Sequence, residues 1–339
     1  MKIAIVAHSI FGVSEPYKGG LEKFIHKLAN KLVEYGLDVT LFCNSKTEEG
    51  LYKKIAFTDF EYNFDNQFDS LNKDYKELIN YLSTNNEFDL IHNNSLNNNM
   101  MQLSKGRTPV LTTIHIPAMG EFKDAVFKNI VNHNNYINIV SASCLKSWKG
   151  IKSCRVIHNG IDVNLWDSSC DNRQGAIWFG RVCPEKGVER SIQAAISASM
   201  PITIAGIIND QDYFNYLKNK YKHRFNYIGL CDHKKLNSLI KSSEVFIKAP
   251  VWEEPFGYVY LESLASGTPI ATYDSFIANE ILNSDVASIT NTNIRSLGLG
   301  AIRSSRLSAA DCVKYVRNNF SLEKTVREYI QLYKDICTR

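Results

Sequence analysis

The stretch EEPFGYVYLESLASGTPIATY, from Glu253 to Tyr273, contains a turn, a helix and a strand in direct succession. Pro-Phe-Gly forms the turn, the helix begins near Tyr258, and PIATY has the length and apolar character of a buried strand. The first amide groups of a helix lack intrahelical partners and lie at the positive end of its dipole. We therefore expect the backbone at Gly257, Tyr258 and Val259 to bind phosphate oxygens.

Two carboxylates flank this turn. Glu254 precedes the helix, where a negative charge complements the helix dipole. Glu262 lies about one turn inside, roughly 6 Å further along the axis, among apolar neighbours that argue against a solvated face. With a diphosphate held at the amides, each carboxylate can accept hydrogen bonds from vicinal hydroxyls. The alternative is that Glu254 is an ordinary acid at a helix N-terminus and that Glu262 is a solvated surface residue.

Composition limits the classes of protein that the chain can represent. Its 339 residues suffice for about two domains, and 44% hydrophobic with 22% charged residues is ordinary for a globular protein. No apolar run approaches the roughly 20 residues that span a bilayer, and the N-terminus lacks signal-peptide character. Eight singly scattered cysteines indicate neither a zinc site nor disulfides, so we expect a cytoplasmic protein.

Strand-length apolar runs alternate with helix-period segments along the whole chain. The expected strands are KIAIVA, DVTLFC, DLIHNN, VLTTIH, INIVSA and RVIHN in the first part and AIWFGR, PITIAG, NYIGL, EVFIKA and PIATY in the second. Such runs, apolar on both faces, indicate parallel sheets covered by helices on both sides. The polar segment DSSCDNRQG, Asp167 to Gly175, reads as a linker after which the pattern restarts. We predict two doubly wound Rossmann-like α/β domains, 1–166 and 167–320, that face an interdomain cleft. A terminal helix over 321–339 is expected to pack back on the first domain. Its apolar stripe is expected to consist of Leu322, Val326, Tyr329 and Leu332.

Two loops that follow strands carry further candidate residues. Gly19-Gly20 stands directly before a helix, where glycines let a phosphate approach backbone amides; they can equally form a simple turn. Neither a G-x-G-x-x-G nor a Walker A sequence is present. GRVCPEKG places two cations, Arg181 and Lys186, across another strand-to-helix turn. Together they can neutralise a diphosphate.

These residues carry a resemblance to a known family. Gly19-Gly20, NGID (Asn159 to Asp162), GRVCPEKG and EEPFGYVYLESLASGTPI occur in family order and cover nearly the whole chain. The chain resembles the retaining GT-B glycosyltransferases of the "glycosyl transferases group 1" family, of the family-four type. The resemblance implies two Rossmann-like domains, with a nucleoside-diphosphate sugar mainly on the C-terminal one and the acceptor mainly on the N-terminal one.

The resemblance also implies a role for each matching residue. Arg181 and Lys186 hold the donor diphosphate, Glu262 binds the ribose and Glu254 contacts the donor sugar. The amides after Phe256, at Gly257, Tyr258 and Val259, meet the phosphate, and the Gly19-Gly20 loop closes on phosphate and sugar. His115 matches the family histidine near the reacting carbon, although the residues alone favour a strand-end histidine satisfied by the following loop.

One segment departs from the family pattern. The family has a Gly-Gly pair shortly after GTPI and before a glutamate, whereas this chain has Ser275 and Phe276 before Glu280. That loop normally lies near the sugar or the nucleotide, so the identity of the donor stays open.

The expected reaction moves a sugar from a nucleoside-diphosphate donor to a hydroxyl, with the leaving charge stabilised by cations and amides. No metal or cofactor is expected, and retention of configuration follows from the resemblance only. The pair Asp210 and Asp212 in DQD suggests a manganese–nucleotide site as an alternative, but such residues also cap helices. A sugar-nucleotide epimerase and a non-catalytic sugar-nucleotide or glycan-binding protein also remain open.

The acceptor is expected to be a surface glycan or a lipid-linked sugar, with modified-base DNA as the alternative. The run SCLKSWKGIKSCR, Ser143 to Arg155, combines four cations with Trp148. Such a basic face of the N-terminal domain suits anionic lipid or nucleic acid, so peripheral membrane contact is also considered.

Overall fold

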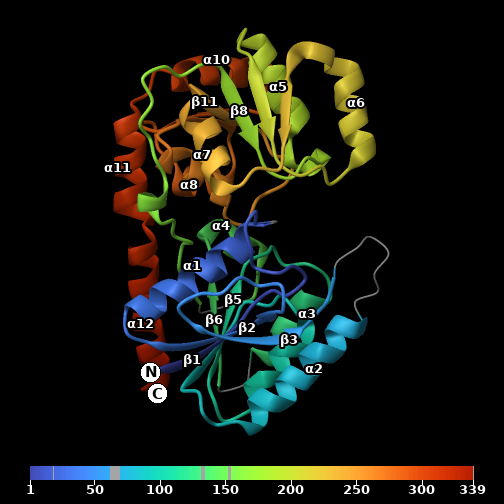
Figure 1. The fold of residues 1–339 in the computed structure, drawn as a ribbon, viewed down its shortest axis with the longest axis vertical. Helices are drawn as coiled ribbons and strands as arrows, with labels where there is room; N and C mark the ends of the chain where they lie inside the picture. The colour runs from blue at the N-terminus through green and yellow to red at the C-terminus, as the bar shows by residue number, and fades with distance from the viewer. Residues whose placement is uncertain (18, 62–68, 131–133, 152–153, 339) are drawn as a thin grey trace. The chain divides into compact units, whose positions relative to one another are not determined.

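Alternating strands and helices form two parallel sheets in the computed structural model of the chain (Figure 1). The structure describes residues 1–17, 19–61, 69–130, 134–151 and 154–338. Two compact units result. One contains residues 1–160 with 322–339, and the other contains residues 161–321.

The first unit has a seven-stranded sheet in the order β3-β2-β1-β4-β5-β6-β7. All neighbouring strands are parallel. The strands are β1 Lys2–Val6, β2 Asp38–Asn44, β3 Lys53–Thr58, β4 Leu90–Asn93, β5 Val110–Ile114, β6 Asn135–Ile139 and β7 Arg155–Val156. The helices are α1 Gly20–Glu34, α2 Asp69–Thr84, η1 Asn98–Lys105, α3 Gly120–Asn129, α4 Ala142–Ser147 and α12 Leu322–Cys337.

The second unit has a six-stranded parallel sheet in the order β10-β9-β8-β11-β12-β13. The strands are β8 Ala176–Phe179, β9 Ile202–Ala205, β10 Asn226–Gly229, β11 Val245–Lys248, β12 Ile270–Tyr273 and β13 Ala287–Thr290. The helices are η2 Val163–Leu165, η3 Pro184–Lys186, α5 Val188–Ser197, α6 Gln211–Tyr221, η4 Lys222–Arg224, α7 His233–Lys241, α8 Tyr258–Ala265, α9 Phe276–Ile281, α10 Ile294–Ser304 and α11 Ala309–Phe320. Helices α5 and α10 pack together against β11, and α8 packs with α11 and β12.

The two doubly wound Rossmann-like sheets that the sequence predicts are therefore confirmed. Two strands escaped the sequence pattern, β3 and β13. β3 reads KKIAFT and is half-exposed, because it lies at the edge of its sheet and has only one neighbouring strand. An edge strand carries polar residues that weaken its apolar signal.

The second unit begins at Ile161, earlier in the chain than the sequence-based division after Trp166. The reason is that the predicted linker is fastened to α7. The Trp166 ring lies 4.4 Å from the His233 ring, centroid to centroid. The Asp167 amide donates to Asn237 Oδ1 at 3.1 Å, and Asn237 Nδ2 donates to the Asp167 carbonyl at 3.0 Å.

The C-terminal helix α12 belongs to the first unit and lies beside α1 (Figure 1). Its two buried tyrosines meet polar groups of the central strands. His92 Nδ1 is 2.7 Å from the Tyr333 hydroxyl, and His92 Nε2 is 2.6 Å from Thr113 Oγ1. Asn138 Nδ2 donates to the Tyr329 hydroxyl at 3.2 Å. The end of the chain is thus built into the polar interior of the N-terminal sheet.

The buried stripe of α12 differs in one residue from the predicted one. The sequence suggested Leu332 beside Leu322, Val326 and Tyr329, whereas the structure buries Tyr333 and leaves Leu332 partly exposed. Tyr333 lies four residues after Tyr329, so both face the sheet on consecutive turns, and its hydroxyl gains a histidine partner.

Gly187 shows how closely the start of α5 packs against the end of β11 in the second unit. Its φ of 71° lies in the left-handed region, and a β-carbon there would overlap the carbonyl oxygen of Ala249. The start of α5 can approach the end of β11 only because residue 187 has no side chain.

We predict that the stability of the chain depends on pH through His92. Burial lowers the pKa of His92 to about 3, so the folded chain keeps it neutral while the unfolded chain protonates it below its ordinary value of 6.5. Stability is therefore lost as the pH falls below 6.5. Urea unfolding should show that wild type loses about 2 kcal/mol more than His92→Gln between pH 7 and pH 5.

The exposed histidine His223 supplies the control for this prediction. His223→Gln should lose as much stability as wild type over the same pH interval. An equal loss in His92→Gln and wild type would show that the burial of His92 does not control the acid response.

Gly187→Ala should destabilise the chain by roughly 2–5 kcal/mol, because it combines left-handed backbone with a steric overlap. Gly229→Ala is the matched control, since Gly229 has a φ of 88° but open space around its missing β-carbon. Denaturant unfolding of both variants separates the two effects. Equal losses would mean that the approach to Ala249 costs nothing.

Candidate functional site

The strand order of the second unit reverses between β8 and β11. Ligands of doubly wound sheets bind outside the carboxyl ends of strands at such a reversal. The loop after β8 carries Arg181 and Lys186, and the loop after β11 carries Glu254. The tertiary structure therefore brings together two predicted segments that are about 70 residues apart in sequence.

A buried carboxylate with two ammonium partners lies at this point. Glu254 Oε1 accepts a hydrogen bond from Lys186 Nζ at 2.9 Å and another from Lys248 Nζ at 2.8 Å. The Glu254 side chain is 5% exposed, that of Lys248 4% and that of Lys186 17%. The sequence analysis missed Lys248, whose only signal was a charge at the end of the apolar strand VFIK.

The two lysines control the charge of Glu254. Burial acts to raise the pKa of Glu254, but the charges of Lys248 and Lys186 and their hydrogen bonds outweigh burial and lower the pKa to about 2. Burial lowers the pKa of Lys248, and Glu254 opposes that change. Glu254 is therefore ionised at neutral pH. Together with Lys186 and Lys248 it forms a positively charged cluster at the carboxyl ends of β8 and β11.

Helix α8 begins at this same place. Gly257 is its N-cap, with a left-handed φ of 75°, and no side chain caps the helix. The preceding Phe256 is buried and holds the turn in the core. The amides that follow, at Tyr258 and Val259, belong to the first turn of a helix, where backbone N–H groups favour anions.

Glu262 lies inside α8 and is 7% exposed, so it is not a solvated surface residue. The pKa of Tyr258 is raised well above its ordinary value by burial, and then by the charges of Glu262 and Asp162. Asp162 comes from the NGID segment, where it caps η2 by accepting from the Asn164 amide at 3.1 Å. Glu262 and Asp162 therefore lie close enough to Tyr258 for their charges to act on it.

Arg181 follows β8 and is exposed. Burial acts to raise the pKa of Glu185, whereas a Cys183 hydrogen bond and the charges of Arg181 and Lys186 act to lower it, with a lowered pKa as the result. The two predicted cations therefore lie in one electrostatic neighbourhood. Lys186 also lies 4.8 Å from the centroid of the Trp252 ring, whose buried Nε1 has no hydrogen-bond partner among the described residues.

The segment that departs from the family pattern forms the start of α9. Ser275 caps this helix by accepting from the Ala278 amide at 3.2 Å, and Phe276 is 57% exposed. Glu253 reaches the same helix, where its Oε1 accepts from the Ile277 amide at 3.2 Å. The sequence-based prediction chose Glu254 and gave no role to Glu253, and the structure gives the two carboxylates different partners.

His115 lies at the end of β5 in the first unit, whose strand order reverses between β1 and β4. Its Nε2 is 2.9 Å from Asn94 Oδ1, so this partner comes from the loop after β4 and not from the following loop that the simpler interpretation expected. Burial, followed by the charges of His92 and His8, lowers its pKa to about 3. His115 is therefore neutral at physiological pH and can act as a hydrogen-bonding group rather than as a cation.

A pocket of about 670 Å³ lies beside this reversal in the first unit. His8 Nδ1, 2.7 Å from the Ser95 carbonyl oxygen, joins the loops after β1 and β4 at its edge. Most of the lining residues are polar, and they include His8, Asn72, Asn97, Asn98, Asn99 and the charged Asp69, Lys73, Lys76 and Glu121. Part of the asparagine-rich segment from Asn93 to Asn99 thus lines a cavity.

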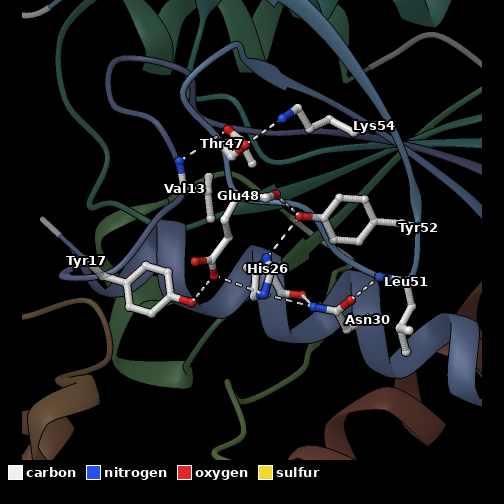
Figure 2. A network of polar contacts seen from close by, with 9 residues as sticks. All are labelled: Val13, Tyr17, His26, Asn30, Thr47, Glu48, Leu51, Tyr52 and Lys54. Atoms are coloured by element: carbon white, nitrogen blue, oxygen red, sulfur yellow. Dashed lines mark hydrogen bonds and ion pairs between the residues drawn. The ribbon is translucent and has the colours of Figure 1, made fainter. Parts of the chain in front are cut away.

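The loop that contains Gly19 is fastened by the polar network in Figure 2. Tyr17 donates to Glu48 Oε1 at 2.6 Å, and His26 Nε2 lies 3.1 Å from the same oxygen. His26 Nδ1 is 2.9 Å from the Tyr52 hydroxyl. The network joins the loop before α1 to the connection between β2 and β3 and so places the predicted glycine pair, with Gly19 as the N-cap of α1.

Gly20 is the first residue of α1, so the pair stands where a helix begins, as the sequence predicts. Gly19 has extended backbone, with φ −151° and ψ 161°, and no side chain caps the helix. Its predicted contact with a ligand stays a prediction.

The predicted basic face is only partly present. Trp148 is buried and donates from Nε1 to the Ile116 carbonyl at 2.9 Å, so it is a core residue rather than a surface aromatic. Arg155 pairs with Asp335 of α12 at 3.1 Å. Lys152 lies outside the described residues. Lys149 is exposed, and Lys146 belongs to α4.

The DQD segment has the capping role that its position suggested. Asp210 is the N-cap of α6 and accepts from the Tyr213 amide at 2.8 Å. Within the described ranges, no group of three or more His, Cys, Asp or Glu side chains is arranged to hold a metal ion. No helix in the described part of the chain is both long and apolar enough to cross a bilayer.

Two family models match the chain, one in each half. "Glycosyl transferases group 1" matches residues 171–304, and "Glycosyltransferase Family 4" matches residues 18–165. An uncharacterized glycosyltransferase of Methanocaldococcus jannaschii is 28% identical over 211 residues, 53% of this chain and 53% of the relative. Glycogen synthase of Mycobacterium tuberculosis is 34% identical over 136 residues, 36% of this chain and 32% of that enzyme. The chain thus spans about half or less of the length of these curated relatives.

Solved structures resemble the whole chain. Sucrose-phosphate synthase from Thermosynechococcus elongatus has a TM-score of 0.80 at 17% identity, over 99% of this chain and 98% of that one. The Anabaena protein HepE in complex with UDP and glucose has a TM-score of 0.78 at 16% identity, over 98% and 99%. At these identities the likeness shows the fold. Both halves of the chain thus match glycosyltransferase family models, and its fold is that of the GT-B glycosyltransferases.

Proposed function

We propose that the chain transfers a glycosyl group from a nucleoside-diphosphate sugar to an acceptor hydroxyl. The observation that carries the proposal is the buried Glu254 with its two lysines beside the uncapped start of α8. Cations and backbone N–H groups at one strand-order reversal suit a diphosphate. The likeness to HepE, solved with UDP and glucose, supports a donor of this kind.

Each part of the donor has a candidate partner. Arg181, Lys186 and the amides of Gly257 and Tyr258 hold the diphosphate, and Glu262 accepts hydrogen bonds from the ribose. Oε1 of Glu254 already accepts from both lysines, so Oε2 is the oxygen that contacts the sugar. His115, neutral and bonded to Asn94, is proposed to contact the reacting sugar, and the Gly19-Gly20 loop to contact its phosphate.

The proposed chemistry is electrostatic. The bond from the sugar C1 to the diphosphate oxygen breaks, a bond from C1 to the acceptor oxygen forms, and the acceptor proton moves to a phosphate oxygen. Arg181, Lys186 and the helix amides stabilise the charge that develops on the leaving group. We propose retention of configuration and independence from metal, so that turnover should survive exhaustive chelation.

The proposed acceptor is a glycan, either on a surface or linked to a lipid. The asparagine-rich pocket of the first unit supports this choice, because carboxamides both donate and accept and so match sugar hydroxyls. The buried Trp148 and the paired Arg155 weaken the case for nucleic acid or membrane through the basic run. The eight cysteines are all free thiols, which supports the expected cytoplasmic location.

A thermal-shift panel of UDP, GDP, ADP and CDP sugars should identify the donor. We expect one base to raise the Tm by about 3 °C or more at saturation. In Glu262→Ala the shift should shrink, since the lost carboxylate hydrogen bonds weaken donor affinity roughly 10-fold or more, while kcat changes less. Absence of a shift with every nucleotide sugar would reject the proposal.

The panel extends to product analysis with the donor that binds. An epimeric nucleotide sugar formed without acceptor would identify an isomerase instead. Binding without release of nucleoside diphosphate, in the presence of any glycan acceptor, would identify a binding protein.

Arg181→Ala should lower kcat roughly 10²–10³-fold, because one group that stabilises the leaving diphosphate is removed. Arg224→Ala, which removes an exposed arginine after α6, is the control and should keep wild-type turnover. Steady-state kinetics with the identified donor measures both. Unchanged turnover in Arg181→Ala would make the diphosphate assignment wrong.

A further inference from the structure

Lys248 is a buried lysine that the proposed reaction does not use. It ends β11, its side chain is 4% exposed, and its Nζ donates to Glu254 Oε1 at 2.8 Å. Its Nζ also lies 5.7 Å from the centroid of the Tyr260 ring. A lysine enclosed in this way cannot reach a ligand, so its effect must pass through Glu254.

Lys186 has two candidate partners, the donor diphosphate and Glu254. The proposed function assigns it to the donor diphosphate, yet in this structure it donates to Glu254 at 2.9 Å. Its side chain is 17% exposed and lies over the Trp252 ring, so it is placed at the boundary between core and solvent. When Lys186 turns to a phosphate, Glu254 loses one of its two ammonium partners. A buried carboxylate left without any partner is strongly destabilised.

We propose that Lys248 is a positioning residue, a resident counter-ion that holds Glu254 charged and in place while Lys186 turns to the donor diphosphate. The inference rests on the proposed function. It explains why a single carboxylate oxygen has two ammonium partners of unequal exposure. Lys248 stays in the core in every step, and Lys186 is the partner that exchanges.

The groups around Glu254 agree with this division of roles. Lys186 from η3, Lys248 from β11 and Tyr260 from α8 interact with Glu254 itself. Cys183 beside η3 acts on Lys248, and Glu253 in the same loop acts on Tyr260. Burial acts to raise the pKa of Glu254; among the charges that lower it, Lys248 has the largest effect and Lys186 the next. The Tyr260 hydroxyl is engaged with Thr272 Oγ1 at 3.0 Å and leaves the carboxylate to the lysines.

Calorimetric titration with free nucleoside diphosphates tests the inference. UDP, GDP, ADP and CDP are titrated into wild type, and the tightest binder is used for the variants Lys186→Met, Lys248→Met, Glu254→Gln and Lys248→Met/Glu254→Gln. These probes carry no sugar, and Glu254→Gln supplies the reference affinity for a chain without charge at position 254. Lys248→Met should bind roughly 10-fold more weakly, because Lys186 must then stay with Glu254.

The double variant decides between a positioning role and a merely structural one. With a neutral glutamine at 254, Lys186 is free, so Lys248→Met/Glu254→Gln should return to within about 3-fold of Glu254→Gln. An equal loss from Lys248→Met in both backgrounds would overturn the proposal. Lys220→Met, which removes a lysine paired with Glu189 at 2.8 Å in the same unit, is the control and should bind as wild type does.

A second readout uses pH. In Lys248→Met, and in Lys248→Gln if the methionine variant does not fold, Glu254 should protonate at a higher pH than in wild type. The extra affinity of the nucleotide sugar over the nucleoside diphosphate should then fall between pH 7 and pH 5 in the variant and stay constant in wild type. A constant difference in both proteins would contradict the proposal.

Failure of the inference and failure of the proposed function give different results. If wild type binds none of the four diphosphates, both are overturned. If wild type binds one and Lys186→Met weakens binding, but Lys248→Met does not, only the inference about Lys248 is overturned.

Discussion

The ionised carboxylate of Glu254 is the constraint around which the second unit is arranged. A charge this deeply buried persists only with compensating charge and hydrogen bonds, and two lysines supply them, one in η3 and one at the end of β11. To bring them there, the end of β8 and the end of β11 must meet. The strand order brings these two ends together, because β8 and β11 are neighbouring strands at the point where the order reverses.

The packing behind the site serves the same arrangement. The left-handed Gly187 lets the start of α5 approach the end of β11, and Gly257 lets α8 begin directly after Glu254. Both glycines therefore have a steric reason that is independent of any ligand. The consequence for function is that an anion-favouring helix start and a positively charged cluster share one edge of the sheet.

The first unit buries two histidines that carry no charge. His92 and His115 stay neutral, and each has hydrogen-bonding partners among asparagine, threonine or tyrosine. Because His92 joins β4 to α12, the last helix of the chain is part of the interior of the first unit. The pocket beside the reversal of this sheet combines asparagine side chains with the charged residues Asp69, Lys73, Lys76 and Glu121.

The amino-acid sequence by itself determined the two parallel sheets, because strands buried on both faces read as short apolar runs between helical segments. It also indicated Arg181, Lys186 and Glu254, since loops after strands carry ligand-binding residues in such folds, and Glu262 in the helix that follows. The edge strand β3 escaped because one exposed side dilutes the apolar signal. Only the tertiary structure decided that Lys248 partners Glu254, that Tyr333 rather than Leu332 faces the first sheet, and that Trp148 lies in the core. Each of these depends on contacts between segments far apart in the chain, and local composition and spacing do not encode which distant groups meet.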